Sequence, residues 1–314
     1  MQINMRFERN PIRQLPDGTV AKVYPFHISM EGLEMCILCR DEEDYDVFVK
    51  IFHICSRRKN VIIIIYAVVS NHGHAVVMAE NQESAEGYGD EIKRMYSMYF
   101  NRKYGERSTL RHVDTKAIWL NNDWYLRNSI AYDIRNAMDN GAQSVQTYRW
   151  TGYRGAFCNG RVHDGIKVKK VCELTKRERR RIMHTDDDLS KVKWLVNESG
   201  ELEPASTIDW KYLENAFYGD QTYFMKLIGN VNTAEMTCNL VMNPRRRLGD
   251  SDFLTEVNGI SQRWFSAEIS SLSIEKKARL IQYVSHCFMT GIPQISRAFG
   301  LDRSAVRRLL GKID

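Results

Sequence analysis

Two histidines, His72 and His74, stand two residues apart, directly after the most apolar segment of the chain, residues 61–69. An apolar run of this length predicts a buried β-strand. Because side chains alternate between the two faces of a strand, both imidazoles are expected on one face, close enough to share one metal ion. The pair therefore predicts half of a metal site, although two core histidines whose polar groups are satisfied fit the same pattern.

The elements that must position this pair follow from hydrophobic periodicity. Strands are predicted at residues 21–30 and 61–69, and helices at residues 43–55, 83–104 and 123–137. Residues 74–78 either continue the second strand or begin its hairpin partner. Asp123 is a candidate N-cap for the third helix, and Gly141 follows that helix. Alternating strands and helices with an antiparallel pair predict an α+β fold, and a ferredoxin-like antiparallel sheet is the simplest arrangement.

The last forty or so residues carry a separate pattern. Ser273 can cap a helix that runs to residue 289, Gly300 supplies a turn, and Asp302 can cap a final helix to residue 310. This spacing predicts a helix-turn-helix over residues 271–314. Its last helix would present groups able to contact phosphates and base edges, namely Arg303, Ser304, Arg307 and Arg308. A plain helical packing unit is the alternative.

Composition limits the class of protein. With 314 residues, 43% of them hydrophobic and 27% charged, the chain can form a full core and two domains. The longest apolar run is far shorter than the roughly 20 residues of a membrane helix, and no signal-peptide core is present, so a cytoplasmic protein without a membrane partner is expected. The seven cysteines are an odd number in mostly apolar surroundings, which favours reduced thiols. The net charge is +6, with basic clusters at residues 167–181 and 245–247, so these clusters are either polyanion-binding surfaces or solvated helix faces.

Six segments resemble one known family in their content and order. They are residues 26–29, 41–48, 66–74, 99–104, 125–136 and 148–153. Within residues 18–157, the chain resembles the REP-associated tyrosine transposases, which are single-tyrosine members of the HUH endonuclease superfamily. The resemblance implies that His72 and His74 bind a divalent metal, Mg²⁺ or Mn²⁺. It also implies that Tyr132 is the nucleophile and that the amide of Asn136 is a further metal ligand.

Helical spacing supports the last two assignments independently, because Tyr132 and Asn136 at positions i and i+4 share one helix face. A phenol with a pKa near about 10 is a poor nucleophile at neutral pH, and a metal that polarises a phosphodiester makes its attack feasible. The resemblance implies a 5′-phosphotyrosine intermediate and a free 3′-hydroxyl. Tyr125, Tyr148 and Tyr153 equally fit core aromatics with hydrogen-bonded hydroxyls.

The chain departs from the family pattern at three places. Gly73 replaces the bulky hydrophobic residue between the two histidines, which is expected to remove a packing contact and to loosen the strand by roughly 1 kcal/mol. Ala137 stands in place of a proline, and residues 30–32 lack the usual arginine-glycine pair. These departures leave open a catalytically silent, domesticated DNA-binding regulator.

The predicted substrate is single-stranded or hairpin DNA, held by basic side chains and aromatic stacking. Candidate groove residues are Arg94, Arg102, Lys103, Arg107 and Arg111, with Tyr99 and Tyr104 nearby in the sequence. The sequence thus predicts a DNA endonuclease and strand-transferase domain at residues 1–157, a helical basic region at 158–270 and a DNA-binding module at 271–314. A metal-binding RNA-processing protein is a weaker alternative, and the oligomeric state, monomer or homodimer, is open.

Overall fold

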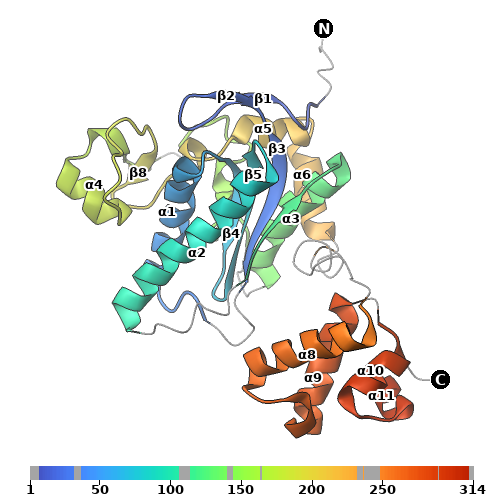
Figure 1. Cartoon of the computed structure of the whole chain (residues 1–314). Helices are drawn as coiled ribbons and strands as arrows, with labels where there is room; N and C mark the ends of the chain where they lie inside the picture. Colours follow the sequence, from blue (N-terminus) through green and yellow to red (C-terminus); the bar gives the residue numbers. More distant parts are fainter. Residues whose placement is uncertain are drawn as a thin grey trace. The chain divides into compact units, whose positions relative to one another are not determined.

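The computed structural model describes residues 7–31, 37–105, 114–139, 144–162, 165–231, 236, 248–288 and 290–310. The chain splits into two compact units, Met1–Thr233 and Ala234–Asp314 (Figure 1). The mixed α/β architecture with antiparallel sheets is confirmed. The predicted helical region at 158–270 is divided between the two units, so its predicted boundaries do not coincide with this division. Among the described residues, no helix has the length and apolar character that crossing a membrane requires.

A four-stranded antiparallel sheet organises the first unit. Its strands are β3 (Tyr24–Glu31), β4 (Ile62–Val68), β5 (His72–Ala79) and β6 (Asp114–Trp119), in the spatial order β4-β5-β3-β6. β5 turns back from β4 as its hairpin partner, which decides between the two alternatives left open for residues 74–78. Both histidines therefore lie on an inner strand, paired on both sides.

Two helices cover one face of this sheet, and a third covers the other. α1 (Glu42–Arg58) and α2 (Gln82–Tyr104) pack side by side across the first face (Figure 1). α1 begins at Asp41, which forms a capping box with Asp44, and α2 begins at an Asn81 cap and ends at Gly105 in the left-handed region. These local signals set the helix ends close to those predicted.

α3 (Asp123–Asp139) packs against β4 and β5 on the opposite face. Its cap is one residue earlier than predicted, because Asn122 Oδ1, and not the Asp123 side chain, accepts the backbone N–H of Tyr125 at 2.8 Å. Gly141, the predicted residue after this helix, lies outside the described residues.

Short elements complete the first unit around this sheet. They are β1 (Ile12–Gln14), β2 (Val20–Lys22), β7 (Val168–Lys170), α4 (Lys176–Met183), β8 (Leu195–Asn197), α5 (Trp210–Ala216) and α6 (Gln221–Asn230), with 3-10 turns at Gly152–Gly155, Val171–Glu173 and Pro204–Ser206. Part of this layer has its own apolar cluster, in which Met183 and Val196 pack with Ile54 of α1. The region after residue 157 is thereby joined to the sheet through α1.

Within its described residues, the second unit contains α8 (Asp250–Phe265), a 3-10 turn (Ile269–Ser271), α9 (Ile274–Cys287), α10 (Ile292–Phe299) and α11 (Arg303–Leu309). Ser273 and Asp302 cap α9 and α11 as predicted, and Gly300 ends α10 with φ of 61°. The core of this unit buries Val284, Ile295 and other apolar residues of α8, α9, α10 and α11.

One buried histidine lies outside any candidate site. His53 of α1 is fully buried, and neither ring nitrogen has a hydrogen-bond partner within the described chain. Its ring packs against Tyr66 and Trp194, with centroid distances of 5.1 and 5.6 Å. Burial lowers the pKa of His53 to about 3, so the folded protein holds this imidazole neutral.

This shift predicts acid destabilisation with a defined sign. Below its ordinary pKa of about 6.5, His53 binds a proton in the unfolded chain but not in the folded one, so the free energy of unfolding falls as the pH is lowered. The contribution of His53 to this fall in the free energy of unfolding approaches about 1.4 kcal/mol per pH unit. Urea denaturation at several pH values between 7.5 and 5 should give a smaller decline for His53→Leu than for the original protein. Equal declines would contradict the prediction.

Candidate active site and metal-ligating cluster

His72 and His74 lie on the α3 face of the sheet, where strand register puts them. His74 pairs with Ser29 of β3 and with Ala67 of β4, and its side chain is buried, with 1% of its surface exposed. The two ring centroids lie 4.8 Å apart. His72 is partly exposed, and its Nδ1 lies 2.8 Å from Asn71 Oδ1. The predicted proximity of the two imidazoles is therefore present.

α3 brings the predicted tyrosine and asparagine to these rings. The Tyr132 ring lies edge-on to His74 at a centroid distance of 5.4 Å, and only 3% of the tyrosine is exposed. Asn136 lies one turn later, buried near His72. Burial lowers the pKa of His72 to about 4, while a polar contact with Asn136 partly opposes this shift. The structure thus assembles all four residues from two elements.

Two further residues join this group without having been predicted as site residues. His27 of β3 and Asp133 of α3 are both fully buried, and His27 Nε2 lies 2.8 Å from Asp133 Oδ1. The His27 ring stacks on His74 at 5.2 Å with an interplanar angle of 26°. His27 lies in the first segment of the family resemblance, and Asp133 directly follows Tyr132 in the sequence, but only the tertiary structure makes them partners.

The buried, unpartnered imidazole nitrogens of this group suit a divalent cation. Both nitrogens of His74 are buried and have no hydrogen-bond partner among the described residues. Burial lowers the pKa of His74 well below its ordinary value, with the neighbouring His72 and His27 adding to the effect. Neutral imidazoles are the form that binds metal, so the donor set and its protonation state both suit an ion.

Gly73 has a different role from the predicted one. It faces α1, away from the histidine rings, and a Cβ built there would lie 3.0 Å from Phe52 Cζ and 3.3 Å from Phe48 Cζ. The two phenylalanine rings already fill the space of the missing side chain. The prediction that Gly73 removes a packing contact was therefore wrong, because the aromatic side chains of α1 occupy the space that a larger residue at position 73 would fill.

Two of the alternative tyrosines have structural roles. The Tyr148 hydroxyl donates to the carbonyl oxygen of Val68 at 2.7 Å. The Tyr153 hydroxyl contacts the sulfur of Met225 at 3.0 Å. Both are partly buried aromatics with engaged hydroxyls, as the alternative interpretation expected for them.

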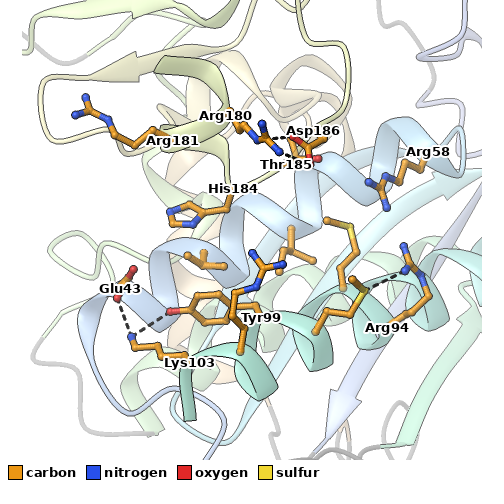
Figure 2. Close-up of a pocket in the computed structure, with 15 residues that line it drawn as sticks. Glu43, Arg58, Arg94, Tyr99, Lys103, Arg180, Arg181, His184, Thr185 and Asp186 are labelled. Atoms are coloured by element: carbon orange, nitrogen blue, oxygen red, sulfur yellow. Dashed lines mark hydrogen bonds and ion pairs between the residues drawn. The ribbon is translucent and has the colours of Figure 1, made fainter. Parts of the chain in front are cut away.

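The predicted groove residues of α2 lie away from Tyr132. Arg94, Arg102 and Lys103 line a cavity of about 690 Å³ between α1, α2 and the α4 region (Figure 2). This cavity lies on the side of the sheet that α1 and α2 cover, whereas the histidines and Tyr132 lie on the side that α3 covers. Arg107 and Arg111 lie outside the described residues. The α2 side chains therefore do not line the neighbourhood of the tyrosine.

Acidic partners already engage part of this basic set. Lys103 Nζ lies within 2.9 Å of carboxylate oxygens of Asp41, Glu43 and Asp44, and the Tyr99 hydroxyl donates to Asp44 at 2.8 Å. Arg94 pairs with Glu91, its neighbour on the same helix. In the second unit, Arg303, Ser304, Arg307 and Arg308 are all exposed on α11, as the sequence predicted.

Comparison with known proteins gives one structural similarity. No protein-family model matches the chain, and no curated protein matches it. Among solved structures, the chain is similar to one described as a REP-associated tyrosine transposase bound to a REP hairpin. The similarity covers 51% of this chain and 89% of that one, with 13% sequence identity and a TM-score of 0.36.

The position of Gly73 predicts a size conflict that can be measured. Gly73→Val should lower the free energy of unfolding by about 1–3 kcal/mol, because the new methyl groups meet Phe52. Phe52→Ala alone should cost about 3–5 kcal/mol through the cavity it leaves. Urea denaturation of the double variant should show a smaller loss than the sum of the two single losses. Strict additivity would show that the two positions do not compete for the same space.

Proposed function

We propose that this protein is a metal-dependent single-stranded DNA endonuclease and strand transferase that acts through a covalent bond between Tyr132 and DNA. The observation that carries the proposal is the assembly of a tyrosine ring, two neutral imidazoles and an amide at one point of the fold. The ring centroids of Tyr132 and His74 lie 5.4 Å apart. An aromatic core contact alone does not require the unpartnered imidazole nitrogens that surround this ring.

The topology supports a ferredoxin-like assignment for the proposed catalytic domain at residues 1–157. The strand order β4-β5-β3-β6, with every pair antiparallel, and two helices on one face match that arrangement. In this assignment, α3 is the element added on the open face of the sheet, and it carries Tyr132, Asp133 and Asn136.

In the proposed reaction, Tyr132 Oη forms a bond to phosphorus as the bond from phosphorus to the 3′-oxygen breaks. The phenol loses its proton in this step, and the departing 3′-oxygen gains one. His72, His74 and Asn136 would hold a divalent ion, Mg²⁺ or Mn²⁺, which supplies charge stabilisation at the non-bridging oxygens. Religation is the reverse reaction and needs no ATP, because the phosphotyrosine bond retains the energy of the broken one.

The burial of Tyr132 adds a requirement to this reaction. With 3% of the tyrosine exposed, a DNA phosphate reaches the hydroxyl only after the side chains that cover it move aside. This burial is the observation that favours the second candidate, a catalytically silent regulator that binds DNA without cutting it. Gly73 no longer favours that candidate, because Phe48 and Phe52 fill its space.

The remaining assignments follow from the first. The proposed partner is DNA, with a single-stranded or hairpin substrate at Tyr132 and duplex DNA at α11, in a cytoplasmic protein without a membrane partner. The capped helices α10 and α11, joined at Gly300, support a helix-turn-helix whose second helix exposes Arg303, Ser304, Arg307 and Arg308. Either a monomer or a homodimer is compatible with this arrangement.

The covalent intermediate is the direct test of catalysis. We expect labelled single-stranded hairpin oligonucleotides from the DNA that flanks the gene to form an adduct on denaturing gels with Mn²⁺, but not with EDTA. Tyr132→Phe should abolish the adduct, whereas the control Tyr153→Phe should keep it, because the Tyr153 hydroxyl lies against the sulfur of Met225. DNA binding without any adduct in the original protein would favour the silent regulator.

Duplex binding through α11 can be tested by its salt dependence. Arg307→Ala with Arg308→Ala should weaken duplex binding and reduce the slope of log K against log salt by roughly 0.9 for each lost phosphate contact. The matched control removes two exposed arginines of α8 and α9, by Arg263→Ala with Arg279→Ala. Equal effects of the two double variants would argue against α11 as the DNA-contacting helix.

A further inference from the structure

We propose that His27, His74 and Asp133 form a buried site for a divalent transition-metal ion, a site to which the family resemblance assigns only His74. Each residue offers a ligand atom, and these atoms all lie within 4.8 Å of one another. The three side chains are 0%, 1% and 0% exposed. They come from three separate elements, β3, β5 and α3, that enclose one point between the sheet and the helix.

Unpartnered polar atoms are the first argument for an ion at this point. His27 Nδ1, Asp133 Oδ2 and both nitrogens of His74 are buried without a hydrogen-bond partner in the described chain. The bond between His27 and Asp133 uses one atom of each residue and leaves the other unsatisfied. A buried polar group without a partner costs about 1–3 kcal/mol, so four such atoms at one point indicate a ligand that satisfies them.

A comparison within the chain separates this cluster from ordinary buried histidines. His53 is also fully buried with two unpartnered nitrogens, but its ring neighbours are Tyr66 and Trp194, which offer no anionic ligand. Around His74, a second imidazole and a carboxylate converge. Burial raises the pKa of Asp133, and the adjacent His27 opposes this shift. A cation would compensate the carboxylate charge in a way that neutral core packing does not.

The donor set selects the class of ion. Two imidazole nitrogens and one carboxylate oxygen suit Mn²⁺, Fe²⁺, Co²⁺ or Zn²⁺, whereas Mg²⁺ prefers oxygen ligands and retained water. The inference rests on the proposed function only in sharing His74 with its metal site. Because metal binding is measured without DNA, failure of this site and failure of the DNA reaction are distinguishable.

Metal titration of ligand variants tests the assignment. The full chain, stripped of metal, is titrated with Co²⁺ and Zn²⁺ and followed by calorimetry and by the visible absorption of Co²⁺. We expect Asp133→Asn and His27→Gln each to weaken binding at least 10-fold. His53→Gln is the matched control for loss of a buried imidazole and should leave binding unchanged. Millimolar Mg²⁺ should not displace Co²⁺.

The opposite pattern overturns the proposal. If Asp133→Asn and His27→Gln leave binding unchanged, the ion is held without the buried pair of His27 and Asp133, and the proposed site is rejected. The absence of any binding by the original protein also overturns it. Should the buried variants fail to fold, anomalous diffraction from Zn²⁺-loaded original protein decides. A peak at about 2.0–2.2 Å from His27, His74 and Asp133 supports the site, and a peak elsewhere rejects it.

Discussion

The antiparallel pairing of β3 with β5 is the constraint on which the candidate site depends. It sets Ser29 opposite His74 and His27 opposite Val76, so His27 and His74 project from the same face. A slip of one residue would send either histidine to the face covered by α1 and α2. The close contact between Gly73 and the rings of α1 favours this register, because a Cβ at that position would lie 3.0 Å from Phe52 Cζ on the opposite face.

The two faces of the sheet have different chemistry as a result. The α1 side is an aromatic core in which Phe48 stacks on Tyr96 at 4.1 Å. The α3 side concentrates imidazoles, a carboxylate and a phenol in a region of equally low exposure. Low dielectric keeps the imidazoles neutral, and it raises the energetic cost of each unsatisfied polar atom. Polar groups retained under such conditions are characteristic of functional sites, where local stability is reduced.

Local patterns in the sequence predict much of this arrangement. The period of two puts His72 beside His74, the helical period puts Asn136 beside Tyr132, and the caps Ser273 and Asp302 locate the last helices. These features depend on a few neighbouring residues. The pairing of His27 with Asp133, 106 positions apart, depends on strand register and helix placement together. Sequence periodicity specifies neither, so both residues were missed as members of the site.

The other differences also arise from tertiary structure. The sequence predicted that Arg102 and Lys103 line the DNA groove, but the side of the sheet that α2 covers is a property of the whole topology. Lys103 shows in addition that a basic residue can be used internally, since three carboxylates surround it. A count of charges along the chain does not separate such residues from those that face solvent.

The contact between Gly73 and Phe52 also bears on how sequences of this type diverge. The volume between β5 and α1 is constant, so a larger residue at position 73 requires a smaller one at position 48 or 52. Substitution at one position alone passes through a strained or hollow intermediate. Residue sizes at positions 73, 48 and 52 are therefore coupled, and the glycine between the two histidines reflects packing against α1 on the opposite face of the sheet.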